Sequence, residues 1–199
     1  MDSKIINGKE IAVKLNNQIK EQIIKGNFSR KPKLVVLQVG NNPASDIYVK
    51  NKKRSCENVG FLFEHIRFEE TILEKQVLDK IHELNNDNTV DGFIVQLPLP
   101  KHINEKLIVS SISRSKDADG FTPSVLGGVM LNDTNIYPAT PFGVKKLLDI
   151  SNIDVVGKNV VIIGRITVCN TKTQNIKDIT KNADILIVAA GVANMVDSS

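Results

Sequence analysis

The spacing of apolar and polar residues predicts alternating helices and strands through the first half of the chain. Apolar side chains recur at helical intervals over residues 8–26, the pattern of a helix with one buried face. Short runs rich in β-branched and aromatic residues predict buried strands. These criteria place strands at 33–39 and 61–68 and within 90–100, and further helices at 45–59 and 74–84. This order predicts an α/β fold with a parallel sheet covered by helices.

The predicted strand within residues 90–100 contains one polar side chain at its carboxyl end. Pro98 and Pro100 stop the strand, because proline cannot donate a hydrogen bond to a sheet ladder. Gln96 comes just before them, and ligands of open α/β sheets bind at the carboxyl ends of the strands. Gln96 is therefore a candidate site residue. The spacing is equally compatible with a glutamine that caps the strand and bonds a loop carbonyl.

The predicted helix at residues 45–59 has a lysine on its apolar side. At 100° per residue, five side chains share this face: Tyr48, Val49, Lys52, Cys56 and Val59. A lysine that is partly removed from water loses some preference for its charged form, so Lys52 is a plausible proton-transfer group. The alternative is a lysine whose ammonium reaches water from the edge of the helix.

Two acids frame an alanine in residues 116–122, which read Lys-Asp-Ala-Asp-Gly-Phe-Thr. This spacing predicts a tight turn that could aim one of the two carboxylates into a cleft. A solvated turn is the common alternative. Farther on, we expect loops at 126–128 and 137–143, a short helix at 144–148, and buried strands at 160–164 and 183–191.

Composition and charge narrow the function classes. The chain is 41% hydrophobic and 24% charged, with a net charge of +4 and no long basic run, so nucleic acid is not implied. Two cysteines suit a reduced compartment, and the three histidines have no metal-ligand spacing, so no metal is expected. No apolar stretch is long enough to span a bilayer, which favours a cytoplasmic protein without membrane contact.

Five segments in a fixed order resemble the methylenetetrahydrofolate dehydrogenase/methenyltetrahydrofolate cyclohydrolase family. They are Ser45-Asp-Ile-Tyr48-Val-Lys-Asn-Lys52, Gln96-Leu-Pro-Leu-Pro, Lys116-Asp-Ala-Asp119-Gly, Thr140-Pro-Phe-Gly143 and Gly157-Lys-Asn-Val-Val-Ile-Ile-Gly164-Arg165. The resemblance implies two domains: a folate-binding catalytic domain at 1–121 and an incomplete Rossmann-like NAD(P)-binding domain at 122–199. It also implies a folate substrate, NADP or NAD as cofactor, and a homodimer.

The resemblance also implies roles for single residues. Lys52 matches the catalytic lysine, and Gln96 matches the residue that holds the lysine amine in position. Asp119 matches the carboxylate that recognises the pterin ring through its donor edge. Tyr48 matches the aromatic ring that lies against the folate. Further substrate contacts are expected at Ser45, Leu97 and Pro98, and cofactor contacts at Thr140, Gly164, Arg165 and Thr171. A different Rossmann-like oxidoreductase is disfavoured, because nothing would then require Lys52, Gln96 and Asp119 together.

The chain departs from the family after Gly164. Only Arg165 and Ile166 separate this strand from the next β-branched run at 167–169, whereas parallel neighbours need a crossover of a dozen or more residues. The turn and helix that would receive a cofactor phosphate are thus expected to be missing, and the carboxyl end is expected to be short. Two alternatives stay open. One is the paired dehydrogenase and cyclohydrolase, with segments omitted from this sequence. The other is a reduced, catalytically crippled relative that binds folate or a partner subunit but not the nucleotide.

Overall fold

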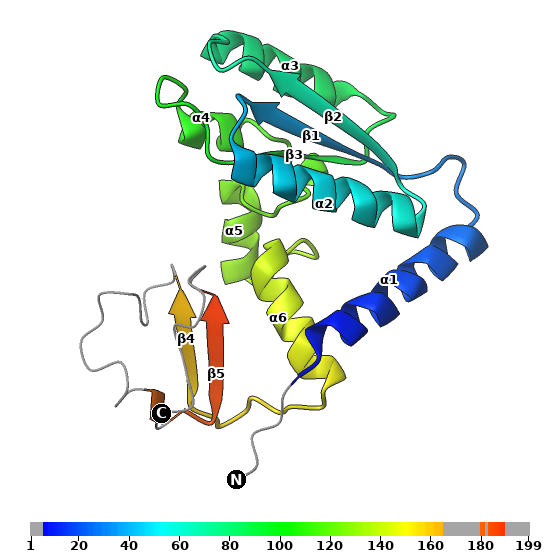
Figure 1. Cartoon of the computed structure of the whole chain (residues 1–199), viewed down its shortest axis with the longest axis vertical. Helices are drawn as coiled ribbons and strands as arrows, with labels where there is room; N and C mark the ends of the chain where they lie inside the picture. The colour runs from blue at the N-terminus through cyan, green and yellow to red at the C-terminus, as the bar shows by residue number, and fades with distance from the viewer. Residues whose placement is uncertain (1–5, 165–179, 182, 190–199) are drawn as a thin grey trace. The chain divides into compact units, whose positions relative to one another are not determined.

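The computed structural model describes residues 6–164, 180–181 and 183–189, which fall into two compact units (Figure 1). The first unit covers residues 1–147 and the second covers 148–199. The elements up to the boundary are, in order, α1 (Gly8–Lys25), β1 (Lys33–Val39), α2 (Pro43–Val59), β2 (Leu62–Phe68), α3 (Glu74–Asn86), β3 (Gly92–Val95), α4 (Glu105–Ser110), the 3₁₀ turn η1 (Arg114–Lys116), α5 (Pro123–Met130) and α6 (Ala139–Ile150), the last of which crosses it.

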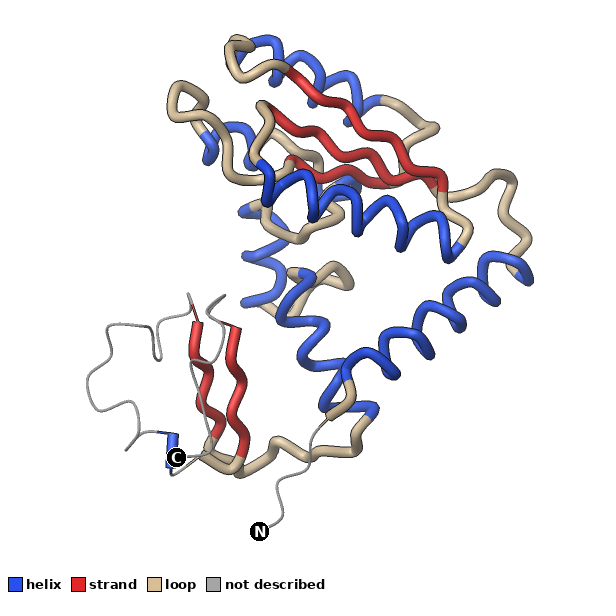
Figure 2. Tube along the Cα trace, viewed as in Figure 1, coloured by secondary structure: helices blue, strands red, loops and turns tan. Residues whose placement is uncertain are grey.

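The first unit is built on a three-stranded parallel sheet in the order β2-β1-β3, which confirms the predicted α/β architecture. Helix α2 covers one face and α3 the other (Figure 2). Because side chains alternate along a strand, β1 serves both faces. Val35 and Leu37 join the larger core with Phe93, whereas Val36 packs with Val49 of α2.

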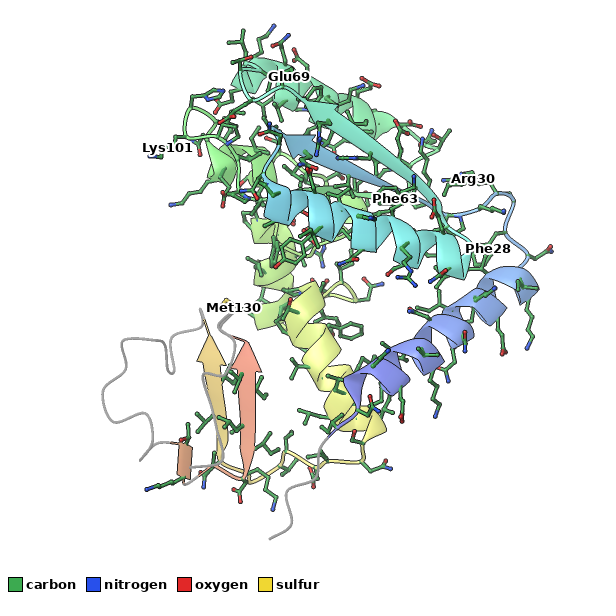
Figure 3. The ribbon with its side chains drawn as sticks, viewed as in Figure 1. Phe28, Arg30, Phe63, Glu69, Lys101 and Met130 are labelled. Atoms are coloured by element: carbon green, nitrogen blue, oxygen red, sulfur yellow. The ribbon has the colours of Figure 1, made fainter. Side chains whose placement is uncertain are left out.

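The second face is completed by Phe63 of β2, which packs at the edge of the α2 cluster (Figure 3). Helix α2 begins two residues earlier than predicted. Its first residue is Pro43, whose missing N–H costs nothing at that position, and the Asn42 side chain accepts a hydrogen bond from the Ala44 amide at 2.9 Å. Gly60 ends the helix at φ 95°, a left-handed conformation that suits glycine.

The loop expected at 126–128 is wrong, because helix α5 runs through it. Thr122 caps this helix through its side-chain oxygen, and Pro123 supplies a first residue that is already held near helical φ. A Cβ on Gly128 would come within 2.9 Å of the Asp133 carbonyl oxygen. Glycine therefore permits a close approach of the following loop, and this outweighs its low helix propensity.

The loop expected at 137–143 is also wrong in most of its length. Helix α6 begins at Ala139 and contains the predicted short helix at 144–148. Pro141 lies in the first turn, where a missing N–H leaves no helical hydrogen bond unmade. The short helix α4 was not predicted.

The second unit contains two parallel strands among its described residues. Strand β4 (Val160–Gly164) pairs with β5 (Ile185–Ala189), so both predicted strands are confirmed. The run at 167–169, which was expected to follow β4 directly, lies outside the described residues, as do Arg165 and Thr171. Within the part of the chain that the structure describes, every helix is too short or too polar to cross a bilayer.

Candidate functional site

Lys52 and Gln96 meet at the carboxyl end of the sheet, as the sequence predicts. The Lys52 Nζ atom donates a hydrogen bond to Gln96 Oε1 at 3.1 Å, and the lysine side chain is partly buried. Gln96 is fixed at its other end as well, because its Nε2 donates to the Leu97 carbonyl oxygen at 2.8 Å. Its backbone N–H bonds Leu37 of β1. The glutamine thus bonds a loop carbonyl and also presents its oxygen to the lysine.

Asp119 lies close enough to Lys52 for the lysine charge to act on its carboxyl group. Burial raises the pKa of its carboxyl above the ordinary value, the positive charge of Lys52 opposes this rise, and the negative charge of Asp117 adds to it. The structure therefore brings together the lysine of α2, the glutamine that follows β3 and a carboxylate of the loop after η1. These are the three residues expected to carry the chemistry.

Helix α2 presents two other predicted site residues differently. Ser45 is buried, whereas Tyr48 is 59% exposed. Of the face that Tyr48 shares with Lys52, the side chains of Val49, Cys56 and Val59 are buried. Tyr48 precedes Lys52 by four residues, which makes the two side chains neighbours on the helix surface. An exposed ring beside a polar site is an available stacking surface for a flat ligand.

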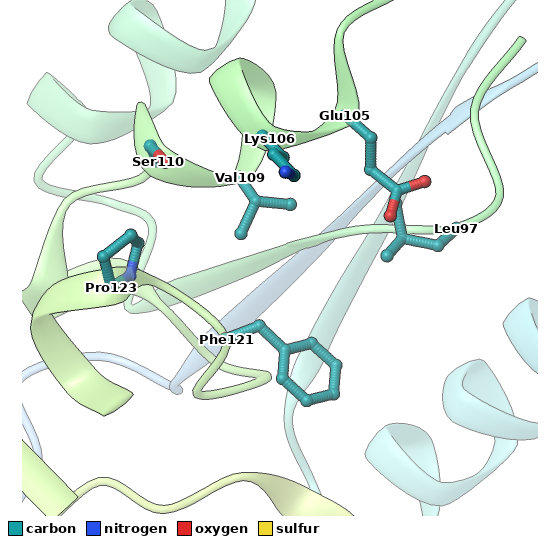
Figure 4. A pocket seen from close by; sticks show the side chains of 7 residues that line it. All are labelled: Leu97, Glu105, Lys106, Val109, Ser110, Phe121 and Pro123. Carbon is teal, nitrogen blue, oxygen red and sulfur yellow. The ribbon is translucent and has the colours of Figure 1, made fainter. Parts of the chain in front are cut away.

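A mostly apolar hollow of about 440 Å³ lies beside these residues (Figure 4). Its walls include Leu97, which follows Gln96, and Phe121, two residues after Asp119. The other lining residues are Glu105, Lys106, Val109, Ser110 and Pro123. Of these lining residues, only Leu97 was expected from the sequence to contact the substrate. Phe121 could have been suspected because it follows Asp119 by two residues. Pro98 lines a different hollow of about 290 Å³ with Asn42 and Pro43.

Two protein-family models match this chain. Residues 6–119 match the tetrahydrofolate dehydrogenase/cyclohydrolase catalytic domain, and residues 165–199 match the NAD(P)-binding domain of the same family. The chain belongs to the tetrahydrofolate dehydrogenase/cyclohydrolase family. Among its relatives in this family, the bifunctional protein FolD of Bacillus cereus is 44% identical over 215 aligned positions, which include 98% of this chain and 75% of the relative. This alignment is longer than the chain itself, so the relative carries residues that this sequence lacks.

Solved structures of the tetrahydrofolate dehydrogenase/cyclohydrolase family share the fold. The bifunctional FolD enzyme of Campylobacter jejuni is 37% identical to this chain and superposes with a TM-score of 0.90. The superposition covers 98% of this chain and 76% of that one. The Trypanosoma brucei dehydrogenase-cyclohydrolase, solved with NADP and an inhibitor, is 26% identical, with a TM-score of 0.87 over 96% of this chain and 72% of that one.

The end of strand β4 is compatible with dinucleotide binding. β4 and β5 are parallel, and β4 ends at Gly164, where open α/β sheets bind nucleotides and where glycine lets a ligand approach the backbone. Thr140 lies exposed in the first turn of α6. The predicted contacts at Arg165 and Thr171 lie outside the described residues.

Proposed function

We propose that this protein oxidises methylenetetrahydrofolate to methenyltetrahydrofolate with NADP and then hydrolyses that product to formyltetrahydrofolate. The observation that carries the proposal is the Lys52–Gln96 hydrogen bond near the partly buried Asp119. The relative from Bacillus cereus is named bifunctional, and the relative from Campylobacter jejuni is named a dehydrogenase/cyclohydrolase. Both names agree with a site that must bind a folate and move protons.

Asp119 and Tyr48 bind the folate in this proposal. The donor edge of a pterin suits a carboxylate that is partly withdrawn from water, because such an acceptor makes stronger hydrogen bonds than a fully solvated one. The exposed ring of Tyr48 lies against the flat substrate. Ser45, Leu97 and Pro98 are proposed as further contacts, with Leu97 in the wall of the hollow beside the site.

Lys52 serves the proton transfers of the hydration step. General acid–base catalysis requires a group within hydrogen-bond reach of the reacting atoms, held in one orientation. Gln96 supplies that orientation, because its amide is fixed by Leu97 on one side and accepts from the amine on the other. The lysine can then give or take a proton without searching for its position.

NADP, when bound, accepts the hydride that leaves the folate. We assign its contacts to Thr140, Gly164, Arg165 and Thr171, and the nucleotide domain to residues 122–199, with the folate domain at 1–121. The Trypanosoma brucei relative, solved with NADP, supports this proposal over the reduced relative without nucleotide binding. Calorimetric titration with NADP tests this assignment, and we expect micromolar binding. If no saturable binding is seen, the chain is better described as the reduced relative, in which the phosphate-binding turn and helix after Gly164 are missing.

Assembly as a homodimer in the cytoplasm is a separate proposal. Met130 at the end of α5 is 89% exposed (Figure 3), and Leu131 beside it is 80% exposed, which leaves apolar surface that a second copy would cover. Light scattering on the purified protein measures the mass directly. A monomer at micromolar concentration would contradict the proposal.

The activity itself is tested with Lys52→Ala and a matched lysine variant. Lys50 lies two residues away on the same helix, but its side chain is exposed. We expect Lys52→Ala to lower the rate of methenyltetrahydrofolate hydrolysis about 100-fold or more, the lower range for a lost acid–base group. Lys50→Ala should retain the wild-type rate, and both should melt as the wild type does. Unchanged hydrolysis in folded Lys52→Ala would refute the role.

A further inference from the structure

Asp117 is a buried carboxylate that the proposed chemistry does not use. It is only 4% exposed. One of its oxygens accepts the backbone N–H of Gly120 at 2.8 Å, and the other accepts the backbone N–H of Thr122 at 2.8 Å. Two charge-assisted hydrogen bonds to backbone amides balance the burial of the charge. The carboxylate therefore closes the loop of residues 117–122, and Asp119 lies inside that loop.

The backbone of Asp117 is attached to the strand that leads to Gln96. Asp117 forms an isolated parallel bridge with Phe93, and the Ala118 N–H donates to the Phe93 carbonyl oxygen at 3.3 Å. A Cβ added to Gly92 would lie 3.2 Å from the Ala118 side chain, so the loop lies directly against β3. The loop of Asp119 is thus fastened at its start to the strand that positions Gln96.

An ordinary turn-forming role does not account for this arrangement. Solvated aspartates commonly form turns, but this one is buried and bonds amides on the far side of Asp119. Helix α5 does not need Asp117 as a cap, since Thr122 caps it. Gly120 adopts φ 74°, and a Cβ there would come within 2.8 Å of the Pro138 nitrogen, so the loop is constrained on its other side as well.

We propose that Asp117 is a positioning residue, which holds Asp119 at a fixed place relative to Lys52 and Gln96 and thereby sets the affinity for folate. This inference rests on the proposed function, in which Asp119 binds the pterin. Folate recognition then depends on Asp117, a residue that does not touch the ligand.

The charge of Asp117 supplies a signature that simple loosening of the loop would not give. The charged groups that act on Asp119 are Lys52 of α2, which lowers its pKa, and Asp117, which raises it. Removing the Asp117 charge should therefore lower the pKa of Asp119. Because the pterin is bound by the ionised carboxylate, the rise in KM on acidification should move to lower pH in Asp117→Asn.

The main test is the KM and kcat of methenyltetrahydrofolate hydrolysis in Asp117→Asn. An asparagine has one acceptor oxygen, and its NH₂ would face a backbone donor, so at least one amide loses its partner. We expect KM to rise roughly tenfold or more while kcat stays within about twofold, since Lys52 and Gln96 are untouched. Asp91→Asn makes the same chemical change at the start of β3, where the carboxylate bonds Arg30 (Figure 3) and the Lys33 amide and no backbone amide of residues 117–122. This control should leave KM and its pH dependence unchanged.

A second pair of variants tests the same bond if Asp117→Asn does not fold. Thr122 has φ −64°, the value that proline requires, so Thr122→Pro removes the N–H donor with little backbone change. Thr122→Ala removes the hydroxyl and the γ-methyl group but keeps the backbone N–H, so it is the control. KM should rise in the proline variant and much less in the alanine variant. Equal KM values in wild type, Asp117→Asn and Thr122→Pro would overturn the positioning role alone. A wild type that does not bind or hydrolyse methenyltetrahydrofolate would overturn the proposed function and this inference with it.

Discussion

Replacing Asp119 by asparagine separates folate recognition from stability, because the two should change in opposite directions. The substitution keeps the shape of the side chain and removes its charge. The carboxyl is buried enough to raise its pKa, and in this proposal it accepts hydrogen bonds from the pterin. The variant therefore loses a charged acceptor in the complex and a partly buried charge in the free protein.

The loss in binding follows from the strength of hydrogen bonds to charged groups. Such bonds contribute about 1.5–3 kcal/mol, and each 1.4 kcal/mol is about tenfold in affinity, so folate should bind about 10- to 150-fold more weakly. Calorimetric titration with tetrahydrofolate measures this directly. Asp79→Asn provides the control, since Asp79 is an exposed carboxylate of α3 whose nearest cation, Lys75, is 3.9 Å away. Unaltered affinity in Asp119→Asn would return Asp119 to the role of a turn former.

The gain in stability has a sign fixed by the raised pKa. Between the ordinary value of 3.8 and its native value, Asp119 binds more protons in the folded state than in the unfolded state. Stability therefore falls as pH rises through this window, and the cost is fully present at neutral pH. Asparagine cannot titrate, so urea unfolding should show a more stable variant at pH 7 and a difference that shrinks as pH falls towards 3.8. A less stable variant at pH 7 would show that the fold depends on this charge.

Three further predictions follow from single contacts. Gln96→Ala removes the acceptor of the Lys52 amine and should lower the hydrolysis rate about 5- to 10-fold, the value of one ordinary hydrogen bond, with the melting temperature nearly kept. Phe93→Ala removes a side chain that is 0% exposed and should destabilise the first unit by about 3–5 kcal/mol in urea unfolding. Asn42→Ala removes the cap of α2 and should cost about 1 kcal/mol, whereas an unchanged unfolding midpoint would show that Pro43 alone starts the helix.

The sequence predicts best those elements that have one dominant local signal. The run at 33–39 is a strand over the same residues in the structure. A short, nearly continuous run of apolar and β-branched residues is typical of a strand of a parallel sheet that is buried on both faces. The face of α2 that carries Lys52 follows from helical geometry alone. Helix α5 could not be predicted in this way, since its two glycines read as a loop and the contact that requires Gly128 comes from residues farther along the chain.

Long-range polar contacts were also beyond local reasoning. Gln38 in β1 is 1% exposed, and nothing in its neighbourhood in the sequence indicates its partners. Its Nε2 donates to Asp46 of α2 at 2.8 Å, and its Oε1 lies 3.0 Å from Nε2 of His65 in β2. Asp46 also pairs with Arg67. This network joins the first turn of α2 to two strands, and only the register of the sheet brings its members together.

The candidate site therefore has two structural supports that share no side chain. Lys52 is positioned by α2, which packs through Val49 on the sheet and is joined to it by Gln38 and Asp46. Asp119 is positioned by a loop that Asp117 closes and fastens to Phe93. The carboxyl end of a parallel sheet is where such separate segments meet, because each strand delivers the residues that follow it to the same edge. If the proposed roles hold, a change in one support should alter either the proton transfer assigned to Lys52 or the folate binding assigned to Asp119, so kcat and KM should report on different parts of the fold.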